Sequence, residues 1–144
     1  CRDIAHHFDW VHSVDRLKVA QRLSSLRTED RHSLNITLQI NLQNETSKAG
    51  ITPASVMELA QEVSQLPNIT LRGLMAIPAP ETNFAEQRNV FRQLRNLMET
   101  INQRLGLELD CLSMGMTNDL EAAIAEGATH VRIGTAIFGP RRKK

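Results

Sequence analysis

The sequence predicts an α/β fold built on a parallel sheet. Short runs rich in strand-forming residues alternate with longer runs of helical periodicity throughout the 144 residues. A strict strand-then-helix order favours parallel strands, because each crossing helix must bury its apolar stripe on the sheet and such crossovers are right-handed. No low-complexity linker divides the chain, so residues 1–144 are expected to form a single domain.

Five strands are expected, each bounded by turn or helix signals. They fall at residues 10–14, 35–42, 71–77, 111–114 and 129–133. A helix expected at residues 16–26 connects the first two. Cys111, at the start of the fourth run, is expected to be a small buried apolar side chain.

Capping residues mark the helix between the second and third strands. Thr52 followed by Pro53 has the residue types favoured at the N-cap and the first helical position. One apolar face follows, and Leu66-Pro67 stops the helix because proline cannot continue it.

Two further helices begin with residues typical of a capping box. Asn83 with Glu86 precedes a long apolar stripe that ends at Gly106, which predicts a helix packed along one face. Asn118 with Glu121 repeats the pattern ahead of a short helix.

Two architectures fit an alternating α/β chain, the open doubly wound sheet and the (β/α)8 barrel. A dinucleotide-binding open sheet needs a Gly-x-Gly-x-x-Gly turn after its first strand, and the sequence contains none. A complete barrel takes eight strands and about 250 residues. Five strands therefore predict an incomplete barrel, whose open sheet edges favour self-association.

Composition indicates a soluble globular protein without a strongly charged partner. The chain has 17 basic and 16 acidic side chains, so no strong field favours nucleic acid or a membrane surface. The basic cluster at residues 141–144 is interpreted as a solvated tail. Two cysteines are too few for a disulfide framework, and the first residues of the chain do not form a signal peptide, so a cytoplasmic location is expected. The chain starts at Cys1 without a methionine, which suggests a missing preceding segment.

Two strand-to-loop turns near the C-terminus suggest an anion site. In barrels, the loops after the last two strands commonly bind a phosphate through backbone N–H groups at a helix start. Gly134 would let the backbone approach closely, and Thr135 could add a hydroxyl donor. Ser113 and Thr117 could supply hydroxyls from the neighbouring loop. On spacing alone, plain turn and cap residues explain the same pattern.

Five segments, in order and spread over the whole chain, carry a resemblance. They are residues 8–16 (FDWVHSVDR), 41–50 (NLQNETSKAG), 71–78 (LRGLMAIP), 112–116 (LSMGM) with Asp119, and 131–135 (VRIGT) with Phe138 and Gly139. Together they resemble the pyridoxal phosphate homeostasis protein family, single-domain barrels similar to the N-terminal domain of alanine racemase. The resemblance implies that the chain is the C-terminal five β/α units of such a barrel.

The resemblance also implies a pyridoxal 5′-phosphate (PLP) site at the C-terminal mouth of the barrel. Arg132 matches an arginine that faces the pyridine nitrogen, and Met75 matches a residue near the ring, although a core methionine is an equal alternative. Gly134 and Thr135 match the contacts to the phosphate. Ser113 and Thr117 match the loop after strand seven.

An arginine facing the ring nitrogen disfavours a pyridinium, which weakens the ring as an electron sink. The family's Schiff-base lysine would precede Cys1, and neither Lys18 nor Lys48 is expected at the carboxyl end of a strand. The resemblance is to a family without known substrate turnover, so the leading hypothesis is a non-enzymatic PLP-binding protein of cofactor homeostasis, in a form lacking that lysine.

Two alternatives stay open. One is an alanine racemase-like amino-acid racemase, which would need a tyrosine base from a second domain, whereas this chain has no tyrosine. The other is a truncated product without function. The five histidines have no metal-ligand spacing and are expected as surface or core residues.

Overall fold

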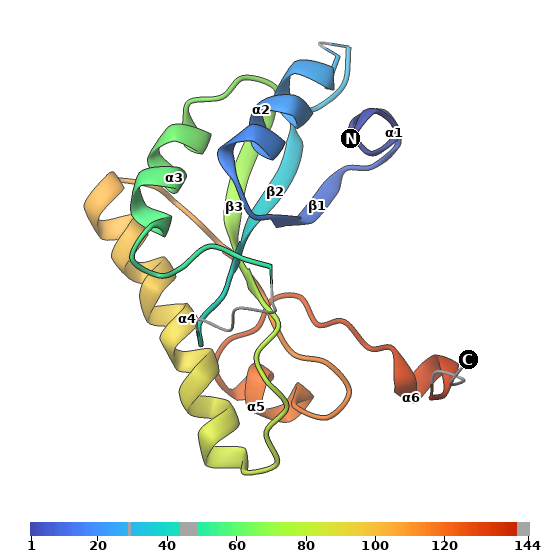
Figure 1. Ribbon diagram of the computed structural model, residues 1–144, viewed down its shortest axis with the longest axis vertical. Helices are drawn as coiled ribbons and strands as arrows, with labels where there is room; N and C mark the ends of the chain where they lie inside the picture. Colours follow the sequence, from blue (N-terminus) through green and yellow to red (C-terminus); the bar gives the residue numbers. More distant parts are fainter. Residues whose placement is uncertain (29, 44–48, 141–144) are drawn as a thin grey trace.

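The computed structural model describes residues 1–28, 30–43 and 49–140, and a four-stranded parallel sheet lies at its centre (Figure 1). The strands are β1 (Trp10–Val14), β2 (Leu34–Ile40), β3 (Ile69–Ala76) and β4 (Cys111–Ser113). They lie side by side in chain order, and every neighbouring pair is parallel. The predicted α/β class and the first four predicted strands are confirmed.

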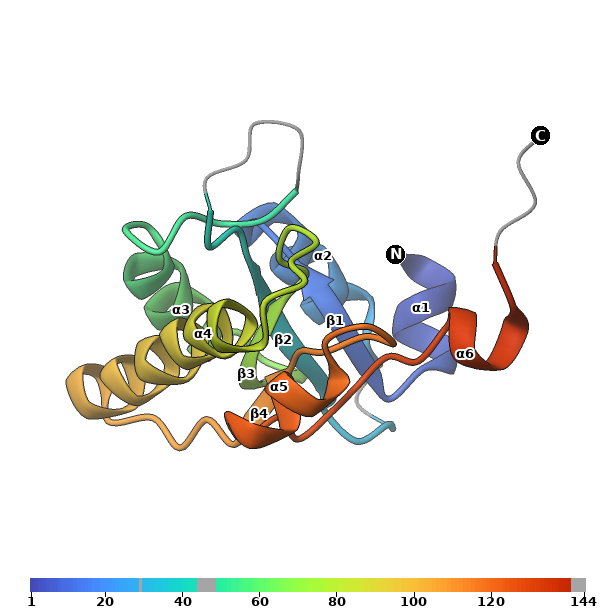
Figure 2. The same cartoon turned by 90° about the horizontal axis from the view of Figure 1, so that it is seen from below.

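Helices connect the strands, and three of them cover one side of the sheet. The helices are α1 (Arg2–His7), α2 (Leu17–Leu26), α3 (Val56–Ser64), α4 (Phe84–Leu105), α5 (Leu120–Ala125) and α6 (Thr135–Phe138). Helices α2, α3 and α4 contact one another in order and contact β3. Seen from below, α3 and α4 lie at one end of the molecule, and α1 and α6 lie at the other (Figure 2).

The hydrophobic core lies between the sheet and these helices. Alternate residues of β2 point into it, as expected for a strand whose successive side chains face opposite sides. The strand residues Leu34, Ile36, Leu38 and Ile40 form one cluster with the helix residues Leu23, Val63, Phe91 and Leu94. All of these side chains are buried.

Helix α4 begins and ends where its caps predict. The Asn83 side chain accepts hydrogen bonds from the backbone N–H groups of Ala85 and Glu86, at 2.9 and 3.2 Å. Gly106 ends the helix with a φ of 64°, a left-handed conformation that glycine adopts at little cost. No described helix is both long and apolar enough to cross a membrane.

The predicted fifth strand at residues 129–133 is wrong as a regular strand. Only His130 forms a bridge, to Ser113 of β4. The backbone N–H groups of Thr129 and His130 both donate to the carbonyl of Leu112. Two residues of this segment therefore lie opposite one residue of β4, and the regular hydrogen-bond register of a strand pair is lost. The segment nonetheless follows β4 in parallel, because Arg132 N donates to Gly115 O at 2.9 Å.

Two predicted helix starts also differ. Helix α3 begins three residues later than its predicted first residue, Pro53, with Ser55 at the N-cap, and the Thr52 hydroxyl instead bonds that of Ser55 at 3.2 Å. Helix α5 follows Asp119 rather than Asn118, and the Asp119 carboxylate accepts the N–H of Met116 at 2.6 Å. In both places a hydroxyl or carboxylate closes a turn ahead of the helix, which delays its start.

Helix α1 was not predicted, and a tertiary contact stabilises it. The Arg27 side chain is only 1% exposed, and its Nη1 donates to the carbonyls of Ala5 and Phe8, both at 2.8 Å. These carbonyls lie in and just after the last turn of α1, where no intrahelical partner exists. A six-residue helix depends on such a contact because an isolated one is unstable in water.

Candidate functional site

A polar cluster lies on the face of the sheet opposite the hydrophobic core. We call it the inner-face cluster. Its members contact one another through side chains from all four strands and the segment after α5. They are Trp10, His12, Asn35, Arg72, Cys111, Ser113, His130 and Arg132.

Three rings form the middle of the inner-face cluster. The ring centroids of Trp10, His12 and His130 lie 5.2–5.5 Å from one another. The Arg72 guanidinium stacks 5.0 Å from the Trp10 ring and is paired with Asp110 at 2.6 Å. Stacking and pairing together fix Arg72 at the amino end of the sheet, away from the loops that follow the strands.

Arg132 lies at the other end of the cluster, close to the carboxyl ends of β3 and β4. Its Nη1 donates to Ser113 Oγ at 2.6 Å, and its Nη2 donates to the carbonyl of Ala76 at 3.0 Å. Burial lowers the pKa of Arg132, and a nearby Asp119 opposes this effect, but an arginine stays protonated in proteins. No ion pair of the described residues includes Arg132.

Arg132 therefore has donors to spare. A guanidinium carries five N–H donors, and two of them bond Ser113 and Ala76. The other three have no acceptor among the residues that the structure describes. A half-buried cation with unused donors is suited to binding an acceptor from outside the chain.

Ser113 connects Arg132 to the ring group. It is fully buried at 0% exposure, and its Oγ lies 2.7 Å from Nδ1 of His12. Burial lowers the pKa of His12, and the nearby His130 and Arg132 lower it further. His12 is therefore neutral near pH 7.

The two turns predicted to form an anion site are neighbours. The Thr117 hydroxyl accepts the backbone N–H of Ala136 at 3.4 Å, which ties the turn after β4 to the start of α6. Gly134 is the N-cap of α6, and a Cβ built on it would meet no atom within 4 Å. The Thr135 hydroxyl has no hydrogen-bond partner in the described part of the chain. Packing within the described part thus does not explain a glycine at position 134.

Met75 is buried but lies outside the hydrophobic core cluster. It is 3% exposed on β3 and pairs in register with Gln39 of β2 and Ser113 of β4. Its side chain therefore shares the sheet face of Ser113 rather than the face packed on the helices.

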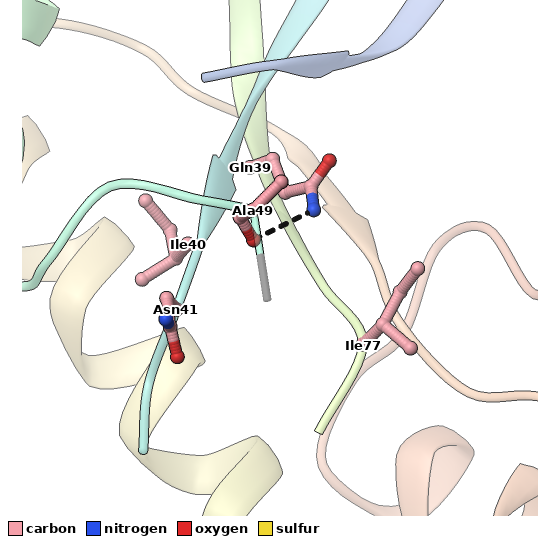
Figure 3. Close-up of a pocket in the computed structure, with 5 residues that line it drawn as sticks. All are labelled: Gln39, Ile40, Asn41, Ala49 and Ile77. Atoms are coloured by element: carbon pink, nitrogen blue, oxygen red, sulfur yellow. Dashed lines mark hydrogen bonds between the residues drawn. The ribbon is translucent and has the colours of Figure 1, made fainter. Parts of the chain in front are cut away.

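A cleft opens beside this region, at the carboxyl ends of β2 and β3 (Figure 3). It has a volume of about 160 Å³ and is lined by Gln39, Ile40, Asn41, Ala49 and Ile77. Gln39 Nε2 donates to the carbonyl of Ala49 at 3.0 Å across it. Ile77 follows Ala76, whose carbonyl accepts from Arg132, so the cleft adjoins the Arg132 group without including it.

The remaining sequence predictions have mixed outcomes. Cys111 is buried as predicted, and burial raises the pKa of its thiol. Lys18 is exposed on α2, while Lys48 and residues 141–144 lie outside the described residues. The sequence prediction missed His12 and His130 as members of a polar cluster. The alternation of Trp10 and His12 along one strand was the available signal, because residues i and i+2 share a face.

Comparisons with known proteins agree with this fold. The pyridoxal phosphate homeostasis protein of Pseudomonas aeruginosa is 57% identical over 140 residues, which are 97% of this chain and 59% of that protein. The protein of the same name from Haemophilus influenzae is 50% identical over 141 residues, covering 97% of this chain and 60% of the relative. The chain thus spans 59–60% of the length of these relatives.

Solved structures are similar as well. PipY of Synechococcus elongatus, solved without PLP, is 39% identical with a TM-score of 0.85, over 96% of this chain and 65% of that one. PipY with PLP bound gives a TM-score of 0.84, over 96% and 64%. An alanine racemase of Clostridium difficile, 14% identical with a TM-score of 0.76 over 99% of this chain and 39% of that one, shares the fold.

The family described as alanine racemase, N-terminal domain, matches residues 1–142. The similarity to pyridoxal phosphate homeostasis proteins that the five sequence segments predicted is confirmed. The chain belongs to the alanine racemase N-terminal domain family.

Proposed function

We propose that this chain carries the phosphate and ring-nitrogen side of a PLP site, in a protein that holds the cofactor for cellular supply without turning over a substrate. The observation that carries the proposal is Arg132. It is held by Ser113 and Ala76, it keeps three donors unused within the described residues, and it lies beside two small-residue turns. The relatives' names and the PLP-bound PipY structure support the choice of ligand.

The residues fit the cofactor's two polar ends. A phosphate dianion requires several N–H and O–H donors, which the turn at Gly134 and Thr135 and the Thr117 hydroxyl could supply. The open space where a Cβ of Gly134 would lie matches a backbone that a ligand approaches closely. Met75, on the same sheet face as Ser113, would pack near the ring.

A protonated arginine at the ring nitrogen disfavours transaminase-type chemistry, which needs a strongly electron-withdrawing ring. When bound, PLP supplies an aldehyde that condenses with amines and a ring that withdraws electrons. The Arg132 guanidinium can donate hydrogen bonds but cannot accept one, so it donates to the ring nitrogen. This disfavours protonation of the ring nitrogen. The ring then withdraws electrons less strongly.

We also propose that the lysine that bonds the cofactor lies outside this chain. Lys18 is exposed in the first turn of α2 rather than on a strand, and the other lysines lie outside the described residues. Borohydride treatment of the chain mixed with PLP should then leave no reduced cofactor attached at one defined lysine. Stoichiometric labelling of a single lysine, read by peptide mass spectrometry, would contradict this.

The fold proposal is that these elements are the C-terminal five β/α units of a (β/α)8 barrel, with residues 129–133 as an irregular last strand. Parallel strands in chain order support a barrel arrangement, and the 59% coverage of the first relative supports an incomplete one. The open edges at β1 and at residues 129–133 would favour self-association of this chain. A cytoplasmic location remains part of the proposal.

Thermal unfolding with pyridoxine 5′-phosphate tests the binding proposal. This probe keeps the ring and the phosphate but lacks the aldehyde, so it needs no lysine. A ligand present at 100 times its Kd stabilises the folded state by about 2.7 kcal/mol. Inorganic phosphate should protect less, because it leaves the Arg132 donors unused.

Two variants and a control sharpen this test. Gly134→Ala should leave the free chain's stability unchanged, because the new methyl group meets nothing, yet should weaken protection by filling the phosphate's space. Thr135→Val should also weaken it, while Thr70→Val, at an exposed position at the amino end of β3, should not. Equal protection of all variants, or no protection of the unmodified chain, would refute the site. Racemisation of alanine by a longer form containing the lysine would favour the enzyme alternative.

A further inference from the structure

We propose that His12 is a positioning residue that acts through Ser113 to hold Arg132 at the cofactor site, and that it must be neutral with its proton on Nε2. The inference rests on the proposed function for its consequence and on the ligand-free structure for its geometry. Neither the family resemblance nor the sequence pattern assigned His12 a role.

The proton of Ser113 determines the tautomer of His12. Arg132 Nη1 donates to Ser113 Oγ at 2.6 Å, so that contact uses a lone pair of the hydroxyl. An arginine cannot accept, so the hydroxyl proton must go elsewhere. Ser113 is fully buried, and the other polar atom that the described residues place against its Oγ is Nδ1 of His12, at 2.7 Å. Ser113 therefore donates to Nδ1, and a neutral His12 carries its proton on Nε2.

A protonated His12 would break this chain of hydrogen bonds. The added proton would occupy Nδ1, so the buried Ser113 hydroxyl would lose its acceptor and face two cations. Two neighbours of His12 act in the same direction, because His130 and Arg132 both lower the pKa of His12 and so disfavour a positive charge on it. The Trp10 ring also lies 5.5 Å from the His12 ring, and the Thr37 hydroxyl donates to the His12 backbone carbonyl at 3.0 Å. No carboxylate ion-pairs with His12 in the described residues.

Loss of the Ser113 contact would remove one of the two hydrogen bonds that fix the orientation of the Arg132 guanidinium. Arg132 would then be held through Ala76 O alone, and rotation about its last torsions would spread its unused donors over several directions. Binding of a ring nitrogen depends on one fixed direction, because misaligned hydrogen bonds weaken steeply. His12 thus contributes to affinity without touching the ligand.

Two substitutions separate positioning from simple packing. His12→Asn keeps an acceptor, its Oδ1, close to where Nδ1 lies, and that acceptor does not titrate. His12→Leu fills similar space without an acceptor. We expect His12→Asn to bind pyridoxine 5′-phosphate within about 3-fold of the unmodified chain, and His12→Leu to bind at least about 10-fold more weakly, as for one charged hydrogen bond.

The pH profile adds a readout that a structural role would not change. Affinity of the unmodified chain should fall as the pH drops below 6.5 and His12 becomes protonated, with the midpoint below that value because its pKa is lowered. His12→Asn should lack this component over the same range. Any loss from protonation of the probe's phosphate appears equally in both proteins and cancels in the ratio.

Nuclear magnetic resonance of the ligand-free chain keeps the proposal testable on its own. Nitrogen shifts of His12 should report the Nε2–H tautomer, and the Arg132 side-chain N–H signals should exchange faster in His12→Leu but not in His12→Asn. A proton on Nδ1, or equal exchange in both variants, would overturn the proposal. If the tautomer is as stated but pyridoxine 5′-phosphate does not bind, the proposed function fails while the hydrogen-bond chain stands.

Discussion

Glu126 is a buried carboxylate held by three arginines of α4, and replacing it with glutamine should destabilise the fold. Its Oε1 lies 2.8 Å from Arg88 Nε and 3.2 Å from Arg92 Nη2, and its Oε2 lies 3.0 Å from Arg95 Nη1. The Glu126 side chain is 1% exposed. In Glu126→Gln, the amide oxygen still accepts a hydrogen bond, but the amide N–H₂ group faces arginine N–H groups, which cannot accept one.

The cost follows from how far each partner is buried. Removing one partner of a fully buried ion pair costs about 3–5 kcal/mol. Here the three arginine side chains are 35–45% exposed and would be rehydrated, which reduces the expected loss to about 2–3 kcal/mol. For a domain of this size, that corresponds to a Tm lower by about 6–12 °C.

Urea and thermal unfolding followed by far-ultraviolet circular dichroism measure this loss. Glu99→Gln is the control, because Glu99 is 56% exposed and lies 3.7 Å from Arg95 on the same helix, so its removal should change little. A Glu126→Gln chain as stable as the control would refute the reasoning.

The same ion pairs predict a pH dependence. The hydrogen bond from Arg92, followed by that from Arg88, holds the pKa of Glu126 below its usual value of 4.5. The stabilisation is therefore present above pH 4.5 and is lost as the pH falls through the lowered pKa of the folded state. The stability difference between the unmodified chain and Glu126→Gln should shrink over that interval.

Three further predictions concern the fold. Gly73→Ala should abolish cooperative unfolding, because the new Cβ would overlap the carbonyl oxygen of Cys111 on the neighbouring strand; a cooperative transition near the original Tm would argue against this. Asn83→Ala removes a cap that accepts two N–H groups and should cost about 1 kcal/mol in urea unfolding, whereas no loss would mean that water replaces the cap. Arg27→Met should raise the hydrogen-exchange rates of α1 selectively, and unchanged protection there would contradict a role in capping.

Local signals were sufficient for most of the fold. Helix α4 follows from its Asn83 cap and apolar stripe because both act within a few residues. Helix α1 could not be predicted, since it depends on Arg27, which lies about 20 residues further along the chain. Residues 129–133 have strand composition, but a regular ladder also requires a register that the doubled contact at Leu112 removes.

The candidate site was predicted through resemblance more than through pattern. Arg132 and the turns at Ser113 and Gly134 came from matched segments, and their role in binding stays a prediction. The role of His12 could not be predicted from the sequence, because it depends on which residue of another strand contacts the imidazole. That residue is Ser113, which is 101 positions away in the sequence.

The inner-face cluster contains the chain's single tryptophan, Trp10, and the chain has no tyrosine. Its indole lies between two imidazoles and an arginine, on the face where the proposed cofactor and any neighbouring strands would arrive. With excitation at a wavelength that phenylalanine does not absorb, ultraviolet emission from this protein therefore comes from Trp10. A change in its wavelength or intensity would report occupancy of that face directly, without any attached dye.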